Sequence, residues 1–485
     1  MVVGELAHER DLIIIGGGPG GYHAAIRAAQ LGKNVTLIEK NQLGGICLNK
    51  GCIPSKVFTH AAERLIASRN DEMLGIKTSG LHFEISKLLN YKNQVVSQLR
   101  SGVEGLCKAN KVEVINGSAF FLSKDKIGVE HDDSYEVYRF NEAIIATGGT
   151  PVKLAGAPIS ERILDIWSIA DLSEVPDHIL VLGDDYIALE MSMAFQAFGS
   201  KVTLILTDED FSYDSSINRE LGRILKKARI SVVKGFSFEE TVLSEEGVAV
   251  LLSCKKESKT VEGSHLFYSL GIKPLLDHLG IDRLGIKLSE EGFIDTDDTG
   301  RTSIENIFAI GDVTRGPKLA VKAIKQGKTA AETICGSASE NDLTFLPKIA
   351  RTQPPIACVG LTEQEAVLQG YEVGAGEFTL SANGFAAILG KKDGVVKVVF
   401  DKTTDLLLGV HMIGSGAVEL ISNGIQALEM AARDEDFRFP SYPHPSLNEA
   451  LLEAVEAFKG EAIHSVPKKQ KVKVKGLGLD WPIQS

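Results

Sequence analysis

One pattern of strand, glycine turn, helix and strand occurs twice in this chain, and it limits the possible folds more than any other feature. The apolar run at residues 11–15 enters the turn Gly16–Gly21, and a helical stretch then leads to a second apolar run at 35–38. A shift of 167 residues superposes this unit on a second one, with Gly16 over Gly183. The repeat predicts two nucleotide-binding βαβ folds in one chain.

The bulk composition fits a large α/β protein of several domains. The chain has 485 residues, of which 44% are hydrophobic and 48 are glycine. Its net charge of −12 argues against a general nucleic-acid binder, whose footprint would be basic. There is no apolar run long enough to predict a membrane span, and residues 1–10 lack the apolar core of a secretion signal. We therefore expect a cytoplasmic protein.

The glycine turn of the first unit has the spacing of a dinucleotide site. Gly16 permits the tight turn, Gly18 lets the backbone approach a pyrophosphate, and Gly21 lets helix and strand pack closely. The helix N-terminus then faces the phosphates, and Glu39 ends the second strand, where a carboxylate can bind ribose hydroxyls. A glycine-rich turn without a ligand is the alternative, but strand, helix and acid together favour the dinucleotide site.

Two of the six cysteines stand close together between glycines. Cys47 and Cys52 lie within Gly44–Lys56, and four residues separate them. If this stretch starts a helix, the spacing allows a reducible disulfide, and the helix N-terminus and Lys56 favour thiolate over thiol. The alternatives are two buried thiols or half a zinc site, but no further zinc ligands are evident, so we expect no metal. The pair indicates electron relay. The other four cysteines are expected to be small buried side chains: Cys107, Cys254, Cys335 and Cys358.

The segment Gly44–Lys56 resembles the redox motif of the pyridine nucleotide–disulfide oxidoreductases. Its Ile-Pro-Ser-Lys ending is similar to the dihydrolipoamide dehydrogenase branch of that family. The resemblance covers residues 11 to about 465, with Ala146-Thr-Gly148, Ala309-Ile-Gly-Asp312 and Val359-Gly-Leu-Thr-Glu363 in the family's order. It implies an α/β fold with two Rossmann-like nucleotide-binding domains and a C-terminal α+β dimerisation domain.

The resemblance and the changes in sequence texture imply five segments. Residues 1–150 would begin the FAD-binding domain and 275–347 would complete it, with an NAD-binding-like domain at 151–274 between them. Residues 348–466 would form the C-terminal interface domain. Residues 467–485 would form a basic tail, which begins with a run rich in lysine.

The resemblance also implies which residues bind FAD and which carry electrons. Cys52 would lie against the flavin, and Cys47 would exchange with the substrate. Lys56 would lie near flavin N5, paired with Glu190, where a cation stabilises the negative charge of reduced flavin. The implied FAD-binding residues are Gly16, Gly18, Gly21, Glu39, Lys56, Thr147, Gly148 and Asp312.

A histidine between two prolines near the C-terminus is the candidate acid–base residue. His444 lies in Tyr-Pro-His-Pro, and Glu449 follows at the start of a predicted helix. A hydrogen bond to that carboxylate would fix the tautomer of the ring and raise its basicity. The family resemblance implies that this element reaches the active site of the other subunit, and hence a homodimer. Tyr442 departs from the family, which usually has a further histidine there, and is expected to alter the pocket wall.

The second nucleotide-binding unit departs from the family pattern. The shift of 167 residues places Asp185 where the first unit has Gly18, and Leu206 where it has Glu39. At about 5 Å and an effective dielectric near 20, the carboxylate repels each unit of phosphate charge by roughly 3 kcal/mol. That repulsion weakens binding by more than about a hundredfold. Leu206 removes the carboxylate for the ribose of NAD, and no arginine follows that would favour NADP.

Two interpretations of this second unit remain open. NAD binds weakly through Gly183, Tyr186 and Ile187, or the domain keeps its fold and has lost normal NAD binding. Ala188 in place of Gly21 is tolerable in this family. In contrast, Leu-Gly-Ile-Lys-Pro at 270–274 replaces the family's Thr-Gly-Arg-x-Pro.

The leading hypothesis is an FAD-dependent dithiol/disulfide oxidoreductase that resembles dihydrolipoamide dehydrogenase. It would oxidise a dihydrolipoyl group on a carrier protein, or a small dithiol, with NAD in doubt as the acceptor. One alternative is a flavoprotein that exchanges electrons with a non-NAD partner. A non-catalytic FAD-binding assembly component is the other, but the joint presence of Cys47, Cys52, Lys56, His444 and Glu449 counts against it.

Overall fold

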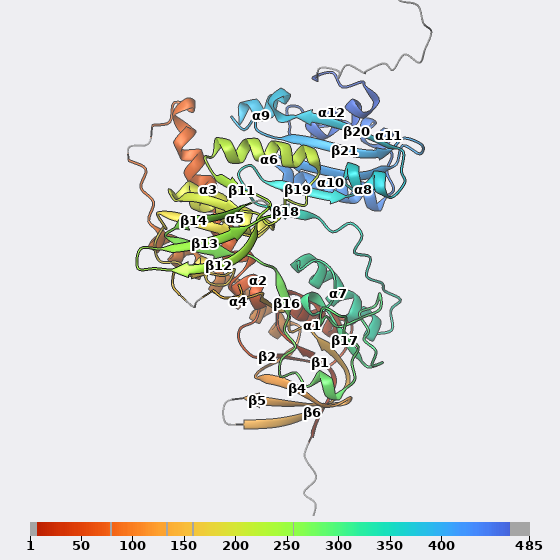
Figure 1. Ribbon diagram of the computed structural model, residues 1–485. Coiled ribbons are helices and arrows are strands. Elements are labelled where there is room, and N and C mark those ends of the chain that lie inside the picture. The colour runs from red at the N-terminus through yellow and green to blue at the C-terminus, as the bar shows by residue number, and fades with distance from the viewer. Residues whose placement is uncertain (1–6, 78–79, 132–133, 158–159, 256, 466–485) are drawn as a thin grey trace, which may run out of the picture.

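The computed structural model describes residues 7–77, 80–131, 134–157, 160–255 and 257–465 (Figure 1). The predicted basic tail at 467–485 lies outside the described residues. Figure 1 shows a first large sheet at the bottom, a second parallel sheet in the middle and a C-terminal antiparallel sheet at the top. This arrangement confirms the predicted α/β class. Among the described residues, no helix is both long and apolar enough to cross a membrane.

The first sheet has seven strands in the described chain, and its centre is parallel. β1 (Ala7–Ile15) lies between β2 (Val35–Glu39) and β6 (Ser134–Ile145), with Ile14 opposite Leu37 on one side. The end of β1 and all of β2 are buried, as expected for parallel strands covered on both faces. The remaining strands are β3 (Glu113–Asn116), β4 (Ser118–Ser123), β5 (Lys126–His131) and β17 (Ile307–Ala309).

Helix α1 (Pro19–Gln30) follows β1 directly, because glycine lets helix and strand approach. A Cβ atom on Gly21 would lie 1.8 Å from the carbonyl oxygen of Gly16, so this contact requires glycine. The helix begins at Pro19, whose fixed φ suits the first helical position. α1 also packs on α7 (Ala320–Ile334), which joins a distant part of the chain to this fold.

The second sheet repeats the parallel arrangement. β9 (His178–Leu182) lies between β10 (Lys201–Ile205) and β15 (His265–Tyr268), and α5 (Tyr186–Phe198) connects β9 to β10. α5 is buried on almost every side and ends at Gly199, which adopts the left-handed conformation at φ 117°. The edge strands are β8 (Ile163–Leu164) and β11 (Ser231–Val233).

A short ladder marks where the chain enters and leaves this second fold. β7 (Gly149–Pro151) pairs antiparallel with β16 (Ile272–Pro274). The residues between these two strands therefore form a separate unit, inserted between two parts of the chain that build the first fold. A three-stranded antiparallel sheet belongs to this unit: β12 (Ser237–Leu243), β13 (Val248–Ser253) and β14 (Ser258–Gly263).

Helix α3 (Cys52–Asn70) joins the two nucleotide-binding folds. It packs on α5 and on α4 (Ile85–Ala109). The ring centroids of Phe58 and Phe195 lie 6.1 Å apart within this contact. Because α3 starts at the cysteine motif, this packing brings the motif next to the second fold.

The C-terminal part is an antiparallel sheet covered by helices. α10 (Ala417–Glu429) packs on β19 (Ile356–Gly360) and β22 (Leu407–Ile413). α12 (Glu449–Lys459) packs on β20 (Val373–Thr379) and β21 (Val395–Asp401). A Cβ atom on Gly376 would lie 1.9 Å from the carbonyl oxygen of Ala454, so α12 lies directly on β20. The remaining strand of this sheet is β18 (Lys348–Ala350), and the shorter helices of this part are α8 (Glu363–Leu368), α9 (Gly384–Ile388) and α11 (Asp434–Arg438). Two helices from other parts of the chain are α2 (Gly45–Asn49), in the cysteine motif, and α6 (Ser215–Lys227), after β10.

Two helices in this part have well-defined limits. α10 ends at Glu429, and Ala431, two residues further on, has a positive φ of 50° that does not continue a helix. α12 begins at Glu449, the residue expected at the start of this helix. The Ser446 amide donates to the Glu449 carboxylate at 2.8 Å, so the preceding residues form a turn against the helix start.

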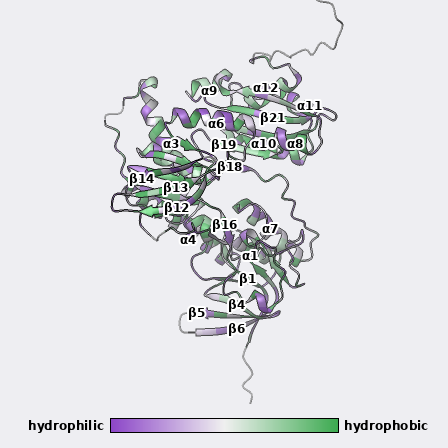
Figure 2. Cartoon of the chain, viewed as in Figure 1, coloured by the Kyte–Doolittle hydropathy of each residue, from purple (hydrophilic) through white to green (hydrophobic). Residues whose placement is uncertain are grey.

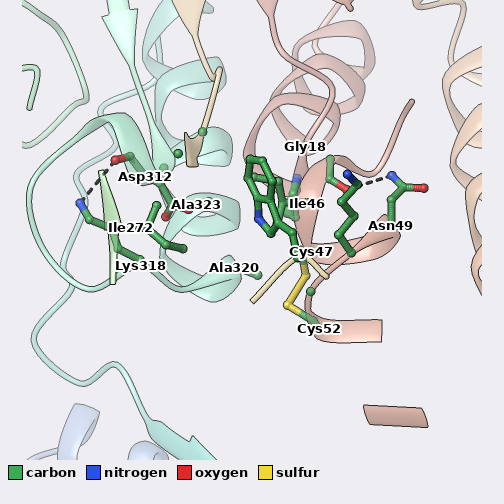
Figure 3. Close-up of a pocket in the computed structure, with 18 of the residues that line it drawn as sticks. Gly18, Ile46, Cys47, Asn49, Cys52, Ile272, Asp312, Lys318, Ala320 and Ala323 are labelled. Carbon is green, nitrogen blue, oxygen red and sulfur yellow. Dashed lines mark hydrogen bonds between the residues drawn. A yellow bond between two sulfur atoms is a disulfide. The ribbon is translucent and has the colours of Figure 1, made fainter. Parts of the chain in front are cut away.

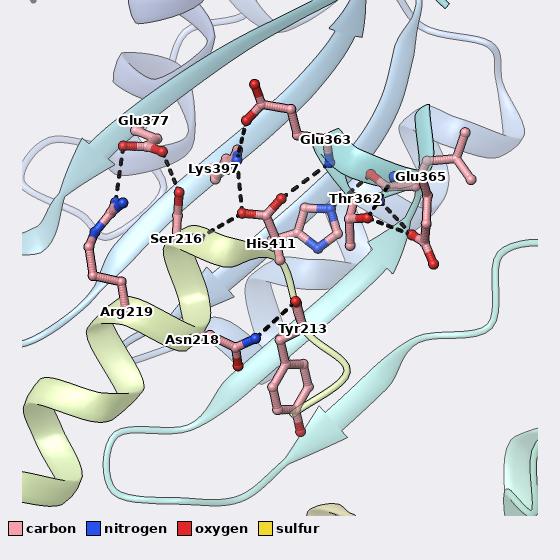
Figure 4. Close-up of polar contacts among 12 residues, drawn as sticks. Tyr213, Ser216, Asn218, Arg219, Thr362, Glu363, Glu365, Glu377, Lys397 and His411 are labelled. Atoms are coloured by element: carbon pink, nitrogen blue, oxygen red, sulfur yellow. Dashed lines mark hydrogen bonds and ion pairs between the residues drawn. The ribbon is translucent and has the colours of Figure 1, made fainter. Parts of the chain in front are cut away.

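Helix α6 attaches the second fold to the C-terminal sheet. Figure 2 shows hydrophobic and hydrophilic residues alternating along it, and its apolar side, which includes Ile217 and Leu221, is buried. At its N-terminus, Asp214 accepts a hydrogen bond from Lys397 of β21 at 2.8 Å, and both side chains are 1% exposed (Figure 4). Lys397 also pairs with Glu363 at 2.6 Å. We call Asp214, Lys397 and Glu363 the interdomain ion cluster.

The interdomain ion cluster is held in its charged state. Burial disfavours the Asp214 carboxylate, but the Lys397 ammonium and the Ser216 amide outweigh it, so the pKa of Asp214 lies below its usual value. This stabilisation is complete above the ordinary aspartate pKa of about 3.9. It is lost as the pH falls through the lower pKa of the folded state.

We expect Asp214→Asn to lower the free energy of unfolding by about 3 kcal/mol at neutral pH, because it leaves a buried ammonium with only its exposed partner. Thermal unfolding monitored by circular dichroism would measure this. The double variant Asp214→Asn with Lys397→Met should lose less than the sum of the two single variants. Additive losses would show that the two side chains do not interact.

Candidate active site

The two cysteines of the glycine-rich motif form a disulfide. Cys47 lies in α2 and Cys52 begins α3, with their Cα atoms 4.7 Å apart. The four other cysteines of the chain carry no disulfide. Cys107 and Cys358 are buried, as predicted, whereas Cys254 and Cys335 are partly exposed.

Two glycines place this disulfide beside the first nucleotide turn. Gly44 and Gly45 have φ values of 92° and 57°, which favour glycine. A Cβ atom on Gly45 would lie 2.7 Å from the Cα atom of Gly18. The cysteine helix can therefore lie directly on the turn that was predicted to bind a pyrophosphate.

A cavity of about 890 Å³ opens between the disulfide and the first sheet (Figure 3). Figure 3 shows Cys47 and Cys52 on one side of it, with Asp312 and Lys318 across from them. Gly21 does not line the cavity because it packs beneath Gly16. All the other residues that the resemblance implies for FAD do line it: Gly16, Gly18, Glu39, Lys56, Thr147, Gly148 and Asp312.

The residues around this cavity fit a flavin dinucleotide. A Cβ atom on Gly18 would meet nothing closer than 3.9 Å, so a phosphate can approach the backbone there. The Glu39 carboxylate is fixed by the Gly17 amide at 2.7 Å and keeps lone pairs for ribose hydroxyls. Trp167 lines the same cavity, and its Nε1 group is buried and has no hydrogen-bond partner among the described residues. A ligand that accepts a hydrogen bond would satisfy it.

An ion pair connects the cysteine helix to the second nucleotide fold. The Lys56 ammonium lies 2.7 Å from the nearer carboxylate oxygen of Glu190, which is 1% exposed. The Arg351 amide donates to the other oxygen of Glu190 at 2.7 Å. The Lys56 ammonium also lies 5.5 Å from the centroid of the Tyr186 ring. A cation is therefore fixed at the cavity wall next to the disulfide.

Two lysines that the sequence analysis did not single out surround Asp312. The Lys318 ammonium hydrogen-bonds to the Asp312 carbonyl at 3.4 Å and to the Thr314 carbonyl at 2.8 Å. Lys322 is fully buried, and burial lowers its pKa to about 8. Burial raises the pKa of the Asp312 carboxyl, and the two lysines oppose that shift. The signal in the sequence was their spacing of four residues, with Lys318 just before α7 and Lys322 in its first turn.

The acid–base candidates lie together on the C-terminal domain, away from this cavity. His444 Nδ1 lies 2.8 Å from a carboxylate oxygen of Glu449, and the histidine side chain is 82% exposed. Burial disfavours the charged form of Glu449, but the bonds from His444 and Ser446 outweigh it, so the pKa of Glu449 lies below its usual value. Tyr442 turns inward and donates to the Phe437 carbonyl at 2.8 Å.

The residues expected to bind NAD weakly do not lie on one open surface. Tyr186 and Ile187 line the large cavity. Gly183 has φ 155°, and a Cβ atom there would lie 2.5 Å from the Ser269 carbonyl oxygen. Among the residues that the structure describes, no group of acidic, histidine or cysteine side chains could hold a metal ion.

The Lys56–Glu190 pair should stabilise the fold more than an exposed pair does. Glu190→Gln keeps the size of the side chain but removes the charge that faces Lys56. We expect a loss of about 1–3 kcal/mol in unfolding free energy, measured by thermal denaturation. Glu63→Gln, which breaks the exposed Lys391–Glu63 pair, is the control and should cost less than about 1 kcal/mol. Equal losses in the two variants would contradict this account.

Comparison with known proteins covers almost the whole chain. Residues 10–327 match the family described as pyridine nucleotide-disulphide oxidoreductase, and residues 346–455 match its dimerisation domain. The second match supports a homodimer. Dihydrolipoyl dehydrogenase of Geobacillus stearothermophilus is 39% identical over 470 residues, with 96% of this chain and 100% of the relative covered. Dihydrolipoyl dehydrogenase of Bacillus subtilis is 37% identical, with the same coverage.

Solved structures show the same architecture. LpdA from Mycobacterium tuberculosis superposes with a TM-score of 0.85 at 25% identity, over 92% of this chain and 99% of that one. The flavoprotein disulfide reductase RclA from Escherichia coli superposes with a TM-score of 0.82 at 25% identity and the same coverage. The disulfide, the dinucleotide cavity and these matches lead to one conclusion: the chain belongs to the FAD-dependent pyridine nucleotide-disulphide oxidoreductases.

Proposed function

We propose that this protein oxidises dihydrolipoyl groups through the Cys47–Cys52 disulfide and FAD. The observation that carries the proposal is the disulfide itself, which lines the dinucleotide cavity together with Lys56. Relatives that cover 96% of this chain at 36–39% identity are dihydrolipoyl dehydrogenases. A dithiol on a flexible carrier is a substrate that such a disulfide can accept by exchange.

The chemistry that these residues support is thiol–disulfide exchange assisted by a base. A substrate thiolate attacks the Cys47 sulfur, forms a mixed disulfide and releases the Cys52 thiolate. The second substrate thiol gives its proton to His444, attacks the substrate sulfur of the mixed disulfide and releases Cys47 as a thiolate. The substrate leaves oxidised, and the cysteine pair holds two electrons. Bound FAD would accept this electron pair.

Two residues prepare the site for these steps. The Glu449 carboxylate accepts from His444 Nδ1, which leaves Nε2 to take the substrate proton. The Lys56 ammonium, fixed by Glu190, would stabilise negative charge on the Cys52 thiolate and on the flavin.

The partners follow from the position of His444. It is not among the described residues that line the cavity of its own chain, and its high exposure leaves it available to the cavity of a second subunit. We therefore assign the acid–base function to the partner subunit of a homodimer. A lipoyl group on a cytoplasmic carrier protein is the expected substrate.

Mixing the purified protein with dihydrolipoamide under anaerobic conditions tests the proposal. The dithiol should produce, within one turnover, the long-wavelength absorbance that a cysteine thiolate gives beside oxidised flavin. Cys47→Ser should show this absorbance without any reductant, because Cys52 remains as a thiolate, and Cys52→Ser should not. Cys335→Ser is the control and should behave like the unchanged protein. A flavoprotein that dihydrolipoamide leaves unchanged would refute the function.

Replacement of the proposed base should slow reduction by the dithiol. His444→Gln is expected to lower the stopped-flow rate constant by about 10²–10⁴-fold. His464→Gln, which removes another exposed imidazole paired with a glutamate next to α12, should leave the rate within about twofold. Because the pKa of Glu449 is lowered, its carboxylate stays ionised above about pH 5 and keeps its hydrogen bond to His444. Equal rates in the two variants would remove His444 from the mechanism.

A further inference from the structure

The second nucleotide fold fills its own anion site with a side chain. Asp185 is the N-cap of α5, and one of its carboxylate oxygens accepts a hydrogen bond from the Ala188 amide at 2.9 Å. The Ser269 hydroxyl donates to the other oxygen at 2.5 Å. In the first fold the corresponding residue is Gly18, which faces open cavity. The same position therefore receives a ligand in one unit and supplies a carboxylate in the other.

Asp185 accepts hydrogen bonds from the backbone amides at the start of α5, which a bound phosphate would also need. A phosphate at such a helix binds the first free amides of the N-terminus. Burial raises the pKa of Asp185, while hydrogen bonds from Ser269 and from the amides of Ala188 and Ile187 oppose the shift. These three donors hold the carboxylate in place. A pyrophosphate would have to displace it from a buried position.

The ribose side of the second fold is also rearranged. In the first fold, the Glu39 carboxylate at the end of β2 accepts from the amide of Gly17 in the glycine turn. In the second fold the acid and the donor exchange places between the turn and the strand end. Asp184 of the turn accepts from the amide and the hydroxyl of Thr207, which follows β10. The acid has moved from the strand end to the turn, and Leu206 at the strand end is fully buried.

The charges around this crevice do not favour a dinucleotide either. Residues 208–210, Asp-Glu-Asp, follow the end of β10. Lys234 pairs with Asp210 of this run. The potential at this edge of the sheet is therefore negative, and an anionic cofactor would meet repulsion.

We infer that the second nucleotide fold of this protein excludes NAD(H) and NADP(H), because Asp185 occupies the pyrophosphate position and Asp184 replaces the ribose anchor.

The fold still supplies two side chains that support other parts of the structure. Glu190 of α5 holds Lys56 at the disulfide, and Asp214 ties α6 to the C-terminal sheet. This inference deepens the proposed function, since it concerns the second half of the same reaction, but it makes a separate claim.

Calorimetry with NADH and NADPH on the FAD-loaded protein tests the inference. The unchanged protein should show no binding below about 1 mM. Asp185→Gly with Leu206→Glu should bind NADH at least about tenfold more tightly, because it reopens the helix N-terminus and restores the ribose carboxylate. Glycine at an N-cap costs only a few tenths of a kcal/mol, so this variant should fold.

Two further variants separate the causes. Asp185→Asn removes the charge but keeps the cap and should give an intermediate affinity. Asp208→Asn removes a neighbouring charge without opening the helix and, like the unchanged protein, should show no binding below about 1 mM. Micromolar NADH binding by the unchanged protein would overturn the inference, and so would a double variant that gains no affinity. Dithiol reduction, measured without nucleotide, reports the proposed function separately, so the two claims can fail independently.

Discussion

The ion pair between Lys56 and Glu190 connects the parts of this molecule on which the site depends. Lys56 lies one turn into the helix that begins at Cys52, and Glu190 lies in the buried helix of the second nucleotide fold. The Arg351 amide, at the start of the C-terminal domain, completes the contact. Three regions of the chain therefore meet at a single carboxylate beside the disulfide. Without it, a cation in the cavity wall would have no fixed position.

The second nucleotide fold bridges two other parts of the structure. Its helix α5 supports the cysteine helix, and its helix α6 docks on the C-terminal sheet through the interdomain ion cluster. Neither contact involves the crevice at the ends of β9 and β10. Structural support and nucleotide binding depend on different side chains of this domain. Substitutions that prevent nucleotide binding can therefore leave the supporting contacts in place.

Local patterns in the sequence predicted most of the fold and the redox pair. The glycines of the first turn and the spacing of Cys47 and Cys52 act over a few residues, so the order of residues is sufficient to place them. The Lys397–Asp214 pair joins residues 183 positions apart, and no local signal marks either partner. The charge of Asp185 predicted a conflict with phosphate, but its hydrogen bond from Ser269 joins residues 84 positions apart, which only the fold brings together.

The reversed hydrogen bond between Asp184 and Thr207 has an evolutionary consequence. Once the acid resides in the turn, restoring the arrangement of the first fold requires changes at both 185 and 206, so no single substitution achieves it. Each intermediate would lose an internal contact before it gained a ligand. Stepwise reversion is therefore opposed, because no single substitution restores both the phosphate position and the ribose carboxylate.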